Sequence, residues 1–359
     1  MRIAGFKSIR DQTIELSALN LLIGANGAGK SNFIGVFRLL NDIVASRLQL
    51  AVPLAGGADR ILYFGRKKTD KLILDLEFGW NGYFCELAPS PTDSLLFANE
   101  VIRFHGEGYN NPWTQSLETG HKETALWDEL KRKGAQSVAK HVIDAFQTWR
   151  IYHFHDTSAT SKVKQTGDLN DNRFLRQDAG NLAAFLYRLQ ETQPATFRNI
   201  VEAVRLVAPF FGSFNLQPDR LNPDTIRLEW QEAGSDGYFD ASSISDGTLR
   251  FMSLATLLLQ PELPSTVLLD EPELGLHPYA ITVLAELLQS AAQRTQVVLS
   301  TQSVTLVNQF SPEDVLVVSR VDGASEFKRL SSADLADWID DYALGELWEK
   351  NLLGGRPSR

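Results

Sequence analysis

The stretch Leu19-Asn-Leu-Leu-Ile-Gly-Ala-Asn-Gly-Ala-Gly-Lys-Ser31 decides the fold of this chain. Its first five residues are mostly apolar and predict a strand that is buried on both faces. The residues from Phe33 to Leu40 carry apolar side chains at helical spacing. Between the two, Gly24 to Ser31 matches the pattern G-x-x-x-x-G-K-[ST]. A strand, a glycine-rich turn of this pattern and a helix are typical of a phosphate-binding loop.

The residue types in this loop suit the binding of phosphate. Glycines let backbone N–H groups curl around phosphate oxygens, and the N-terminus of the next helix favours an anion. Lys30 is expected to reach the terminal phosphates and the hydroxyl of Ser31 to bind magnesium. A structural glycine turn is the alternative, but the flanking strand and helix favour the binding loop. The candidate nucleotide contacts are Gly24, Asn26, Gly27, Ala28, Gly29, Lys30, Ser31 and Asn32.

A second motif, Thr266-Val-Leu-Leu-Asp-Glu-Pro272, is an apolar strand that ends in two adjacent carboxylates. In nucleotide hydrolases, one such carboxylate holds magnesium and another group orients or deprotonates the attacking water. This chemistry makes Asp270 a candidate metal ligand together with Ser31, and Glu271 a candidate catalytic residue. Acidic residues at a strand end are often only a solvated turn. The phosphate-binding loop favours the catalytic interpretation.

A third motif, Ser245-Asp-Gly247, stands directly before an apolar helical pattern from Leu249 to Leu259. These residue types are common helix N-caps, so a simple cap is the alternative. The same hydroxyl, N–H groups and helix dipole can also bind a phosphate. We therefore include Ser245, Asp246 and Gly247 among the candidate nucleotide contacts.

The patterns of strand and helix divide the chain into three parts and predict an α/β fold with a parallel sheet. The parts are residues 1–107, with the phosphate-binding loop and antiparallel strands, residues 108–223, which are mainly helical, and residues 224–359, with the other two motifs. Within the middle part, one helix is expected over Lys122–Trp149 and another over Asn181–Leu206.

The composition restricts the class of protein. With 35 Lys and Arg against 44 Asp and Glu, the 359 residues carry a formal net charge of −9, which argues against a generally basic nucleic-acid coat protein. The single cysteine, Cys85, cannot form an internal disulfide. No apolar stretch approaches the roughly 20 residues of a membrane span. A cytoplasmic protein without a membrane segment is expected.

The three motifs, in this order, resemble the core of ABC-type ATPases, which have a P-loop NTPase fold. Asn32 after the Lys–Ser pair is similar to the RecF, SMC and OLD-like branch, whereas transporter ATPases usually have Ser-Thr-Leu there. The run Glu273-Leu-Gly-Leu-His-Pro278 and the segment from Tyr342 to Pro357 look like those of small bacterial predicted ATPases of the AAA family. Some of these are associated with phage defence.

This resemblance implies an ATPase head with a mixed sheet, an antiparallel β subdomain and a helical insertion, which binds ATP and Mg²⁺. In the family, two protomers enclose two nucleotides, so Gly24–Ser31 of one chain would face Ser245–Gly247 of the other. The histidine of the family's switch motif is replaced here by Gln302. Glutamine can hydrogen-bond but cannot gain a proton near neutral pH. Gln302 is therefore a candidate catalytic residue beside Lys30 and Glu271, with slow turnover expected.

Two further features of the sequence, Gln49 and the run from Tyr152 to Asp156, allow more than one interpretation. The family's magnesium-binding glutamine is not assignable, because Gln49 lies in the right region but between two leucines. The run Tyr152-His-Phe-His-Asp156 has metal-ligand residue types, although alternation along a strand explains them equally.

The function that the resemblance implies is that of a Mg-ATP-binding and hydrolysing ATPase. It would form a homodimer on ATP and act as a switch or sensor for a separate effector protein or a nucleic acid, with phage defence as one setting. A RecF-like DNA-repair ATPase is an alternative. A nucleotide-binding subunit of a transporter is disfavoured by Asn32 and by the missing aromatic segment that stacks on the base. The basic run Arg66–Lys68 is either a nucleic-acid contact or a solvated face.

Overall fold

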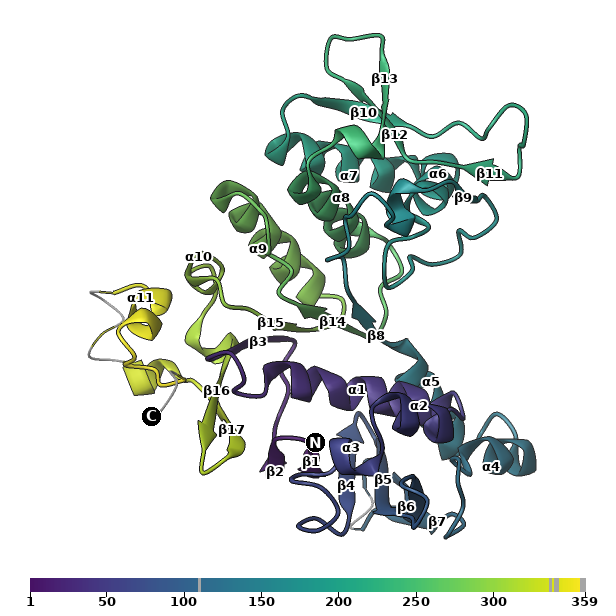
Figure 1. Cartoon of the computed structure of the whole chain (residues 1–359), viewed down its shortest axis with the longest axis vertical. Helices are drawn as coiled ribbons and strands as arrows, with labels where there is room; N and C mark the ends of the chain where they lie inside the picture. Colours follow the sequence, from purple (N-terminus) through teal and green to yellow (C-terminus); the bar gives the residue numbers. More distant parts are fainter. Residues whose placement is uncertain (109–110, 336–337, 339–341, 356–359) are drawn as a thin grey trace.

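The computed structural model describes residues 1–359 except 109–110, 336–337, 339–341 and 356–359, so the last two residues of the segment Tyr342–Pro357 lie outside the described part. A six-stranded sheet runs through the middle of the molecule (Figure 1) in the order β17-β16-β3-β15-β14-β8. Its neighbours are parallel except for β17, which pairs antiparallel with β16. The bounds are β3 (Leu19–Ile23), β8 (Trp149–Tyr152), β14 (Thr266–Asp270), β15 (Gln296–Ser300), β16 (Val315–Val321) and β17 (Ala324–Arg329).

A second six-stranded sheet is antiparallel and has the order β2-β1-β4-β5-β6-β7. Its strands are β1 (Arg2–Phe6), β2 (Ile9–Thr13), β4 (Leu72–Phe78), β5 (Asn81–Pro89), β6 (Leu95–Phe104) and β7 (Trp113–Ser116). Two small sheets, β10-β12-β13 and β11-β9, complete the strands. They comprise β9 (Gly167–Asp168), β10 (Phe211–Asn215), β11 (Thr225–Ile226), β12 (Glu229–Glu232) and β13 (Tyr238–Asp240).

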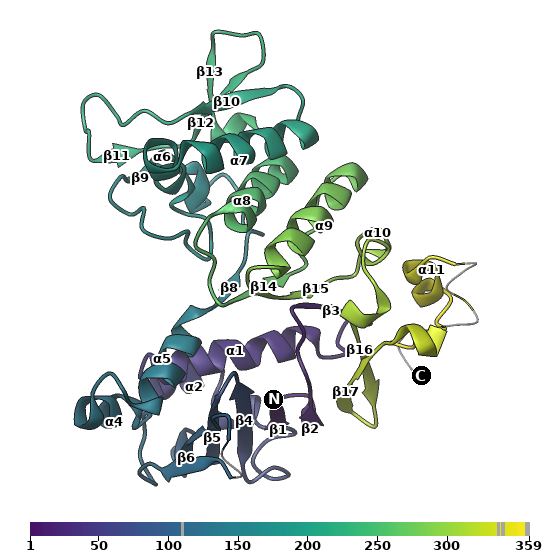
Figure 2. The ribbon, with the colours of Figure 1, turned by 180° about the vertical axis from the view of Figure 1, so that it is seen from behind.

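The helices lie on both sides of the central sheet, as the two opposite views show (Figure 1, Figure 2). The group beside the antiparallel sheet is α1 (Lys30–Val44), α2 (Leu48–Leu54), α3 (Ala58–Ile61), α4 (Leu126–Lys133) and α5 (Val138–Thr148). The other group is α6 (Leu182–Thr192), α7 (Pro194–Val207), α8 (Asp246–Leu259) and α9 (Pro278–Ala292). Nearer the C-terminus are α10 (Val304–Val307) and α11 (Leu344–Glu349), and the 3₁₀ turns are η1 (Lys162–Lys164), η2 (Ala241–Ser243), η3 (Pro312–Asp314) and η4 (Ser332–Leu335).

The central sheet separates two hydrophobic cores. Along β3, Leu21 and Ile23 pack into the core with α6 to α9, whereas Leu22 packs into the core with α1 and α5. β14 alternates in the same way, with Leu268 on the α1 side. Successive side chains of a strand point to opposite faces, so an apolar run is stable only where both faces are covered. The expectation that the strand before the phosphate-binding loop is buried on both faces is confirmed.

The helix expected over Lys122–Trp149 is in fact two helices. α4 ends before Gly134, whose φ of 75° lies in the left-handed region that glycine adopts without a steric penalty. α5 then begins at a proper N-cap, because the Ser137 side chain accepts a hydrogen bond from the N–H of Ala139. Likewise, the helical pattern over Asn181–Leu206 is divided between α6 and α7, where Pro194 occupies the first turn of α7.

Residues 108–223 contribute to several layers of the fold. β7 extends the antiparallel sheet, β8 pairs with β14 in the central sheet, and α6 and α7 lie with α8 beyond that sheet. Within the described residues, no helix is long and apolar enough to cross a membrane.

Candidate functional site

The phosphate-binding loop lies between β3 and α1, at the C-terminal end of the central strand. A side chain at Gly24 would collide with the carbonyl of Val318, and one at Gly29 would collide with the hydroxyl of Ser325. Both glycines have positive φ. Because the backbone of β16 approaches Gly24 and the side chain of Ser325 on β17 approaches Gly29 so closely, only glycine fits at these two positions. The glycines therefore shape the loop as well as free its N–H groups.

Lys30 is buried at the centre of this loop. Its Nζ donates hydrogen bonds to the carbonyl oxygens of Gly24, at 2.6 Å, and of Ala25, at 3.2 Å. Burial lowers the pKa of Lys30, and the nearby carboxylates of Glu271 and Asp270 act in the opposite direction. The ammonium group is thus held inside the loop, where phosphate oxygens would replace the carbonyls as its partners.

Several groups from the far end of the chain hold this loop in place. The guanidinium of Arg320 donates to the carbonyl of Gly27 at 3.1 Å, and the N–H of Ala25 donates to the carbonyl of Gly355 at 2.7 Å. The amide of Asn32 donates to the hydroxyl of Ser8 at 2.7 Å. The side chain of Asn32 therefore faces the β1–β2 turn, while Asn26 and Gly27 are exposed at the tip of the loop.

Ser31 and Asp270 line one cavity of about 690 Å³. Ser31 is exposed in the first turn of α1, and Asp270 is the last residue of β14. The hydroxyl of Ser300, at the end of β15, donates a hydrogen bond to the carboxylate of Asp270. Hydroxyl and carboxylate oxygens are the donors that Mg²⁺ takes from proteins, and substrate phosphates and waters complete its shell. The structure thus brings together the two residues predicted to hold the metal, and their chemistry suits it.

Glu271 and Gln302, two of the predicted catalytic residues, are in direct contact. The amide nitrogen of Gln302 donates a hydrogen bond to a carboxylate oxygen of Glu271. Glu271 has a φ of 44°, a conformation that is uncommon for a residue with a side chain, and its N–H donates to the carbonyl of Ser300 at 2.9 Å. The turn after β14 therefore aims the carboxylate at Gln302.

The buried side chain of Glu273 joins the segment Thr301–Gln302, which follows β15, to the turn after β14. One of its carboxylate oxygens accepts a hydrogen bond from the hydroxyl of Thr301, at 2.5 Å, and another from the N–H of Gln302, at 3.2 Å. The second oxygen has no hydrogen-bond partner among the described residues. Burial raises the pKa of Glu273. In the same run, His277 is the N-cap of α9, because its ring accepts from the N–H of Tyr279.

We expect Gln302→Ala to slow single-turnover ATP hydrolysis by about 10-fold to 100-fold, because a catalytic group displaced by about 1 Å can lose about 100-fold. The variant removes the donor to Glu271 but leaves the phosphate-binding loop untouched, so ATP affinity should hardly change. Gln302→His should recover part of the rate, and Gln289→Ala, an exposed glutamine on α9, is the matched control. An unchanged rate in Gln302→Ala would place the residue outside the site.

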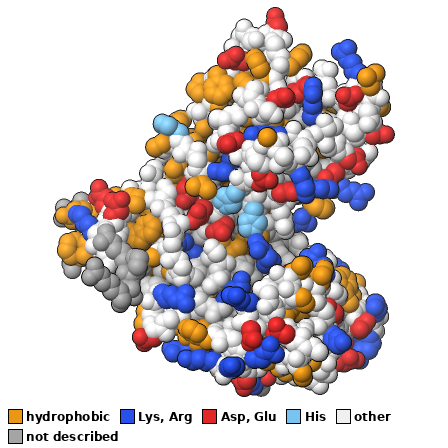
Figure 3. Space-filling model, viewed as in Figure 1, with side chains coloured by type: hydrophobic (Ala, Val, Ile, Leu, Met, Phe, Trp, Pro, Cys, Tyr) orange, Lys and Arg blue, Asp and Glu red, His pale blue; other side chains and the backbone are white. Residues whose placement is uncertain are grey.

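His153 and Arg38 also line the cavity of Ser31 and Asp270. The sequence analysis did not predict either residue as part of the site. His153 follows β8, and its Nε2 accepts a hydrogen bond from the Arg38 guanidinium at 2.8 Å, since arginine can only donate. Burial, and then the charge of Arg38, lower the pKa of His153. In the space-filling view, histidine side chains lie near the middle of this face, beside acidic and basic groups (Figure 3).

Gln49 is not part of the lining of this cavity, although its neighbour Leu50 is. Its amide nitrogen donates to the carbonyls of Leu95, at 2.9 Å, and Lys122, at 2.8 Å. It ties α2 to β6 and to the segment between β7 and α4. Among the described residues, no group of three or more His, Cys, Asp and Glu side chains could hold a metal ion by itself, which includes the run Tyr152–Asp156.

The third motif forms a separate, exposed site at the start of α8. Ser245 is the N-cap, because its hydroxyl accepts from the N–H of Thr248 at 3.2 Å. Asp246 pairs with Lys164, whose side chain is only 8% exposed, at 3.1 Å. In the described part of the chain, no hydrogen bond or ion pair joins Ser245–Gly247 to the phosphate-binding loop. Ser245 and Asp246 are both exposed, and the Ser245 hydroxyl also hydrogen-bonds the hydroxyl of Thr248 at 2.7 Å.

The amino-acid sequence is similar to a family of AAA domains and to ATP-binding proteins of phosphate importers. The family model described as "AAA domain, putative AbiEii toxin, Type IV TA system" matches residues 118–308. The phosphate import ATP-binding protein PstB of Bacteroides thetaiotaomicron is 29% identical over 128 residues, which are 35% of this chain and 47% of that protein. PstB 2 of Bacillus subtilis is 28% identical over 124 residues, 33% of this chain and 42% of that protein. The chain thus spans less than half the length of these curated relatives.

Solved structures with a similar fold are head domains of SMC proteins. An Smc head bound to the C-terminal winged-helix domain of ScpA has a TM-score of 0.56 and 16% identity, covering 92% of this chain and 96% of that one. An Smc head with an extended coiled coil, bound to the C-terminal domain of ScpA from Pyrococcus furiosus, has a TM-score of 0.53 and 14% identity, covering 95% and 98%. The fold is therefore an SMC head-like P-loop NTPase fold, as the motifs predicted.

Proposed function

The chain belongs to the AAA domain family described as putative AbiEii toxins of type IV toxin–antitoxin systems, and we propose that it hydrolyses Mg-ATP slowly and dimerises on ATP. It is an ATP-binding ATPase of the ABC and SMC type. The observation that carries the proposal is the convergence at the ends of three neighbouring strands. There, Lys30 and Ser31 follow β3, Asp270 ends β14 and Glu271 comes directly after it, and Gln302 follows β15.

Within one chain, different residues would bind the phosphates, hold the metal and activate the water. The N–H groups of the loop and Lys30 hold the phosphates, and Ser31 and Asp270 would hold Mg²⁺, which neutralises charge on the phosphate oxygens when it is bound. Glu271 orients the attacking water and accepts its proton. Gln302 keeps the carboxylate of Glu271 in position through a hydrogen bond but cannot gain or release a proton near neutral pH, so we expect slow turnover.

We propose that Ser245, Asp246 and Gly247 complete the site of a second protomer. The N-terminus of α8 is exposed, has a hydroxyl cap and carries the positive end of the helix dipole, which suits a phosphate. Among the described residues, no hydrogen bond or ion pair joins this motif to its own chain's phosphate-binding loop. We therefore infer that it contacts the loop of a partner protomer.

Ser245→Arg should abolish ATP-driven dimerisation and leave nucleotide binding by the monomer intact, because the long side chain would occupy the position of the partner's terminal phosphate. Light scattering with ATP on a Glu271→Gln background measures the mass. Ser116→Arg, on the exposed edge strand β7, is the matched control and should still double in mass. A Ser245→Arg protein that dimerises with ATP would exclude the arrangement.

We propose that the ATP-dependent change of state acts on a separate effector protein, with nucleic acid as an alternative partner. The family's description as a toxin of the AbiEii type supports antiviral defence by abortive infection as the setting. A RecF-like role in DNA repair would be favoured instead if DNA co-purified with the chain.

A further inference from the structure

Residues 344–355 contact two parts of the candidate site that are far apart in the sequence. They comprise α11 and the residues after it up to Gly355, and we call them the C-terminal strap. They lie within the segment from Tyr342 to Pro357, to which the roles proposed above give no part. Figure 1 shows α11 beside α10, on the side of the central sheet where β16 and β17 lie.

One end of the strap packs against α10, which begins two residues after Gln302. The N–H of Gly345 donates a hydrogen bond to the side-chain oxygen of Asn308 at 2.6 Å. A Cβ at Gly345 would lie 2.7 Å from the carbonyl oxygen of Val304, so only glycine lets α11 approach this closely. α11 therefore rests on the helix that follows Gln302.

The other end of the strap lies on the phosphate-binding loop. The carbonyl of Gly355 accepts the hydrogen bond from the N–H of Ala25 at 2.7 Å. Gly355 is buried, and a Cβ there would lie 3.3 Å from the Cα of Gly24. Its φ of 82° also favours glycine. The N–H of Ala25 is thus used to anchor the loop, and the N–H groups after it are left for phosphate.

Between its two ends the strap is folded. α11 closes in a C-terminal turn, because the N–H of Leu352 donates to the carbonyl of Leu347 at 2.9 Å and Asn351 has a φ of 60°. The side chain of Leu347 is fully buried, in the core that also contains Leu306 of α10. A displacement at one end of the strap is therefore transmitted toward the other end.

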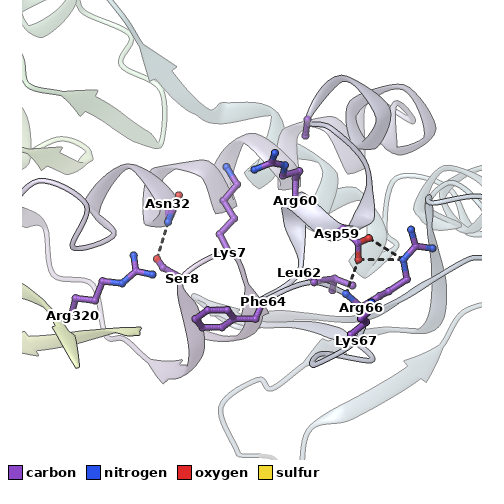
Figure 4. A pocket seen from close by; sticks show the side chains of 12 residues that line it. Lys7, Ser8, Asn32, Asp59, Arg60, Leu62, Phe64, Arg66, Lys67 and Arg320 are labelled. Atoms are coloured by element: carbon purple, nitrogen blue, oxygen red, sulfur yellow. Dashed lines mark hydrogen bonds and ion pairs between the residues drawn. The ribbon is translucent and has the colours of Figure 1, made fainter. Parts of the chain in front are cut away.

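The other supports of the loop come from different segments. Figure 4 shows Arg320 of β16 and the hydrogen bond between Asn32 and Ser8 of the β1–β2 turn. The central sheet fixes the strand ends as well, because the N–H of Thr301 donates to the carbonyl of Leu22 at 3.1 Å. Beyond the sheet, the loop and α10 continue as separate segments, and the strap touches both of them.

We propose that the C-terminal strap positions the phosphate-binding loop and Gln302 relative to each other and thereby sets the rate of ATP hydrolysis. Asn308, Gly345 and Gly355 are then positioning residues, which act through Gln302 and the loop. This inference rests on the proposed function, since it assumes that ATP bound in the loop is hydrolysed with the help of Gln302.

Asn308→Ala tests the end of the strap on α10. The variant removes the acceptor of the Gly345 N–H, and Asn308 is exposed, so the fold is not at risk. Quenched-flow measurement should show single-turnover hydrolysis of pre-bound ATP slowed by about 3-fold to 10-fold, as expected for one lost hydrogen bond. Calorimetry with AMP-PNP and Mg²⁺ should show unchanged affinity. Asn308→Asp keeps an acceptor and should retain the rate, whereas a merely structural contact would change only the thermal unfolding.

Gly355→Ala tests the end of the strap on the loop. The added methyl group would press on Gly24, so hydrolysis of pre-bound ATP should slow by a similar factor. Gly354→Ala is the matched control. Its φ of 80° imposes the same backbone strain on alanine, but the nearest atom to its Cβ, in Ser319, is 4.0 Å away. Gly354→Ala should hydrolyse ATP as the wild type does.

The double variant Asn308→Ala/Gly355→Ala distinguishes one strap from two separate contacts. Independent effects of distant sites add as free energies, so their rate factors multiply. If one segment carries the constraint, release at either end removes it. The double variant should then be about as slow as the slower single variant.

Multiplied losses in the double variant, or a normal rate in either single variant, would overturn the positioning role of the strap. The wild type would still hydrolyse ATP in those cases, so the proposed function would stand. A wild-type protein that does not hydrolyse ATP would overturn the proposed function and this inference together.

Discussion

Lys30→Ala should lose ATP binding by about 100-fold, because a charge-assisted hydrogen bond contributes about 1.5–3 kcal/mol and Lys30 is placed to make more than one. Its ammonium group is buried inside the loop and is close to the acidic residues at the end of β14. Without it, the phosphates would lie near Glu271 and Asp270 with no buried cation between them. Filter binding with labelled ATP in the presence of Mg²⁺ measures the loss.

The matched control is Lys131→Ala, a lysine on α4 whose side chain is 77% exposed, and it should bind ATP as the wild type does. Thermal unfolding of Lys30→Ala should remain cooperative, because the loop keeps its contacts with Arg320 and Gly355. If a folded Lys30→Ala protein bound ATP normally, the nucleotide would have to lie outside this loop.

Glu271→Gln should retain ATP binding and lower the single-turnover rate of hydrolysis by about 10²- to 10⁴-fold, the usual contribution of a general base. Glutamine has the same shape and keeps an oxygen that can accept from Gln302. The turn after β14 should therefore be preserved, and only the ability to accept a proton is lost. Quenched-flow measurement of phosphate release from pre-bound ATP tests this prediction.

Glu262→Gln, an exposed glutamate in the loop before β14, is the matched control and should leave the rate unchanged. Equal losses of ATP affinity in Glu271→Gln and Lys30→Ala would contradict the division of roles between the two residues. Hydrolysis at the normal rate in Glu271→Gln would assign the base to another group.

The sequence predicts the parts of the site that are local. A buried strand followed by the loop Gly24–Ser31, or by Asp270 and Glu271, specifies its own geometry, because strand, turn and helix follow one another along the chain. The meeting of these segments follows from parallel strands, whose carboxyl ends share one edge of the sheet. The contact between Glu271 and Gln302 depends on that same arrangement.

Contacts between distant segments could not be predicted in this way. The pairing of Arg38 with His153 depends on β8 lying beside β14, and no local pattern indicates the order of strands. The end of α4 before Gly134 depends on the left-handed backbone conformation of this glycine. The spacing of apolar residues, from which a helix is predicted, does not indicate that conformation. Likewise, no local pattern indicates that Gly355 lies against Ala25.

The phosphate-binding loop also has a consequence for synthesis of the protein. Its carbonyls at Gly27 and Ala28 are held by Arg320 and Ser325, which are 293 and 297 residues later in the chain. At about 5–20 residues per second, a ribosome needs about 15–60 s to reach these residues after it has made the loop. During that interval the nascent chain has the complete loop sequence but not its supports. We therefore expect translation to the region of β16 and β17 to precede the first productive encounter of each new molecule with ATP.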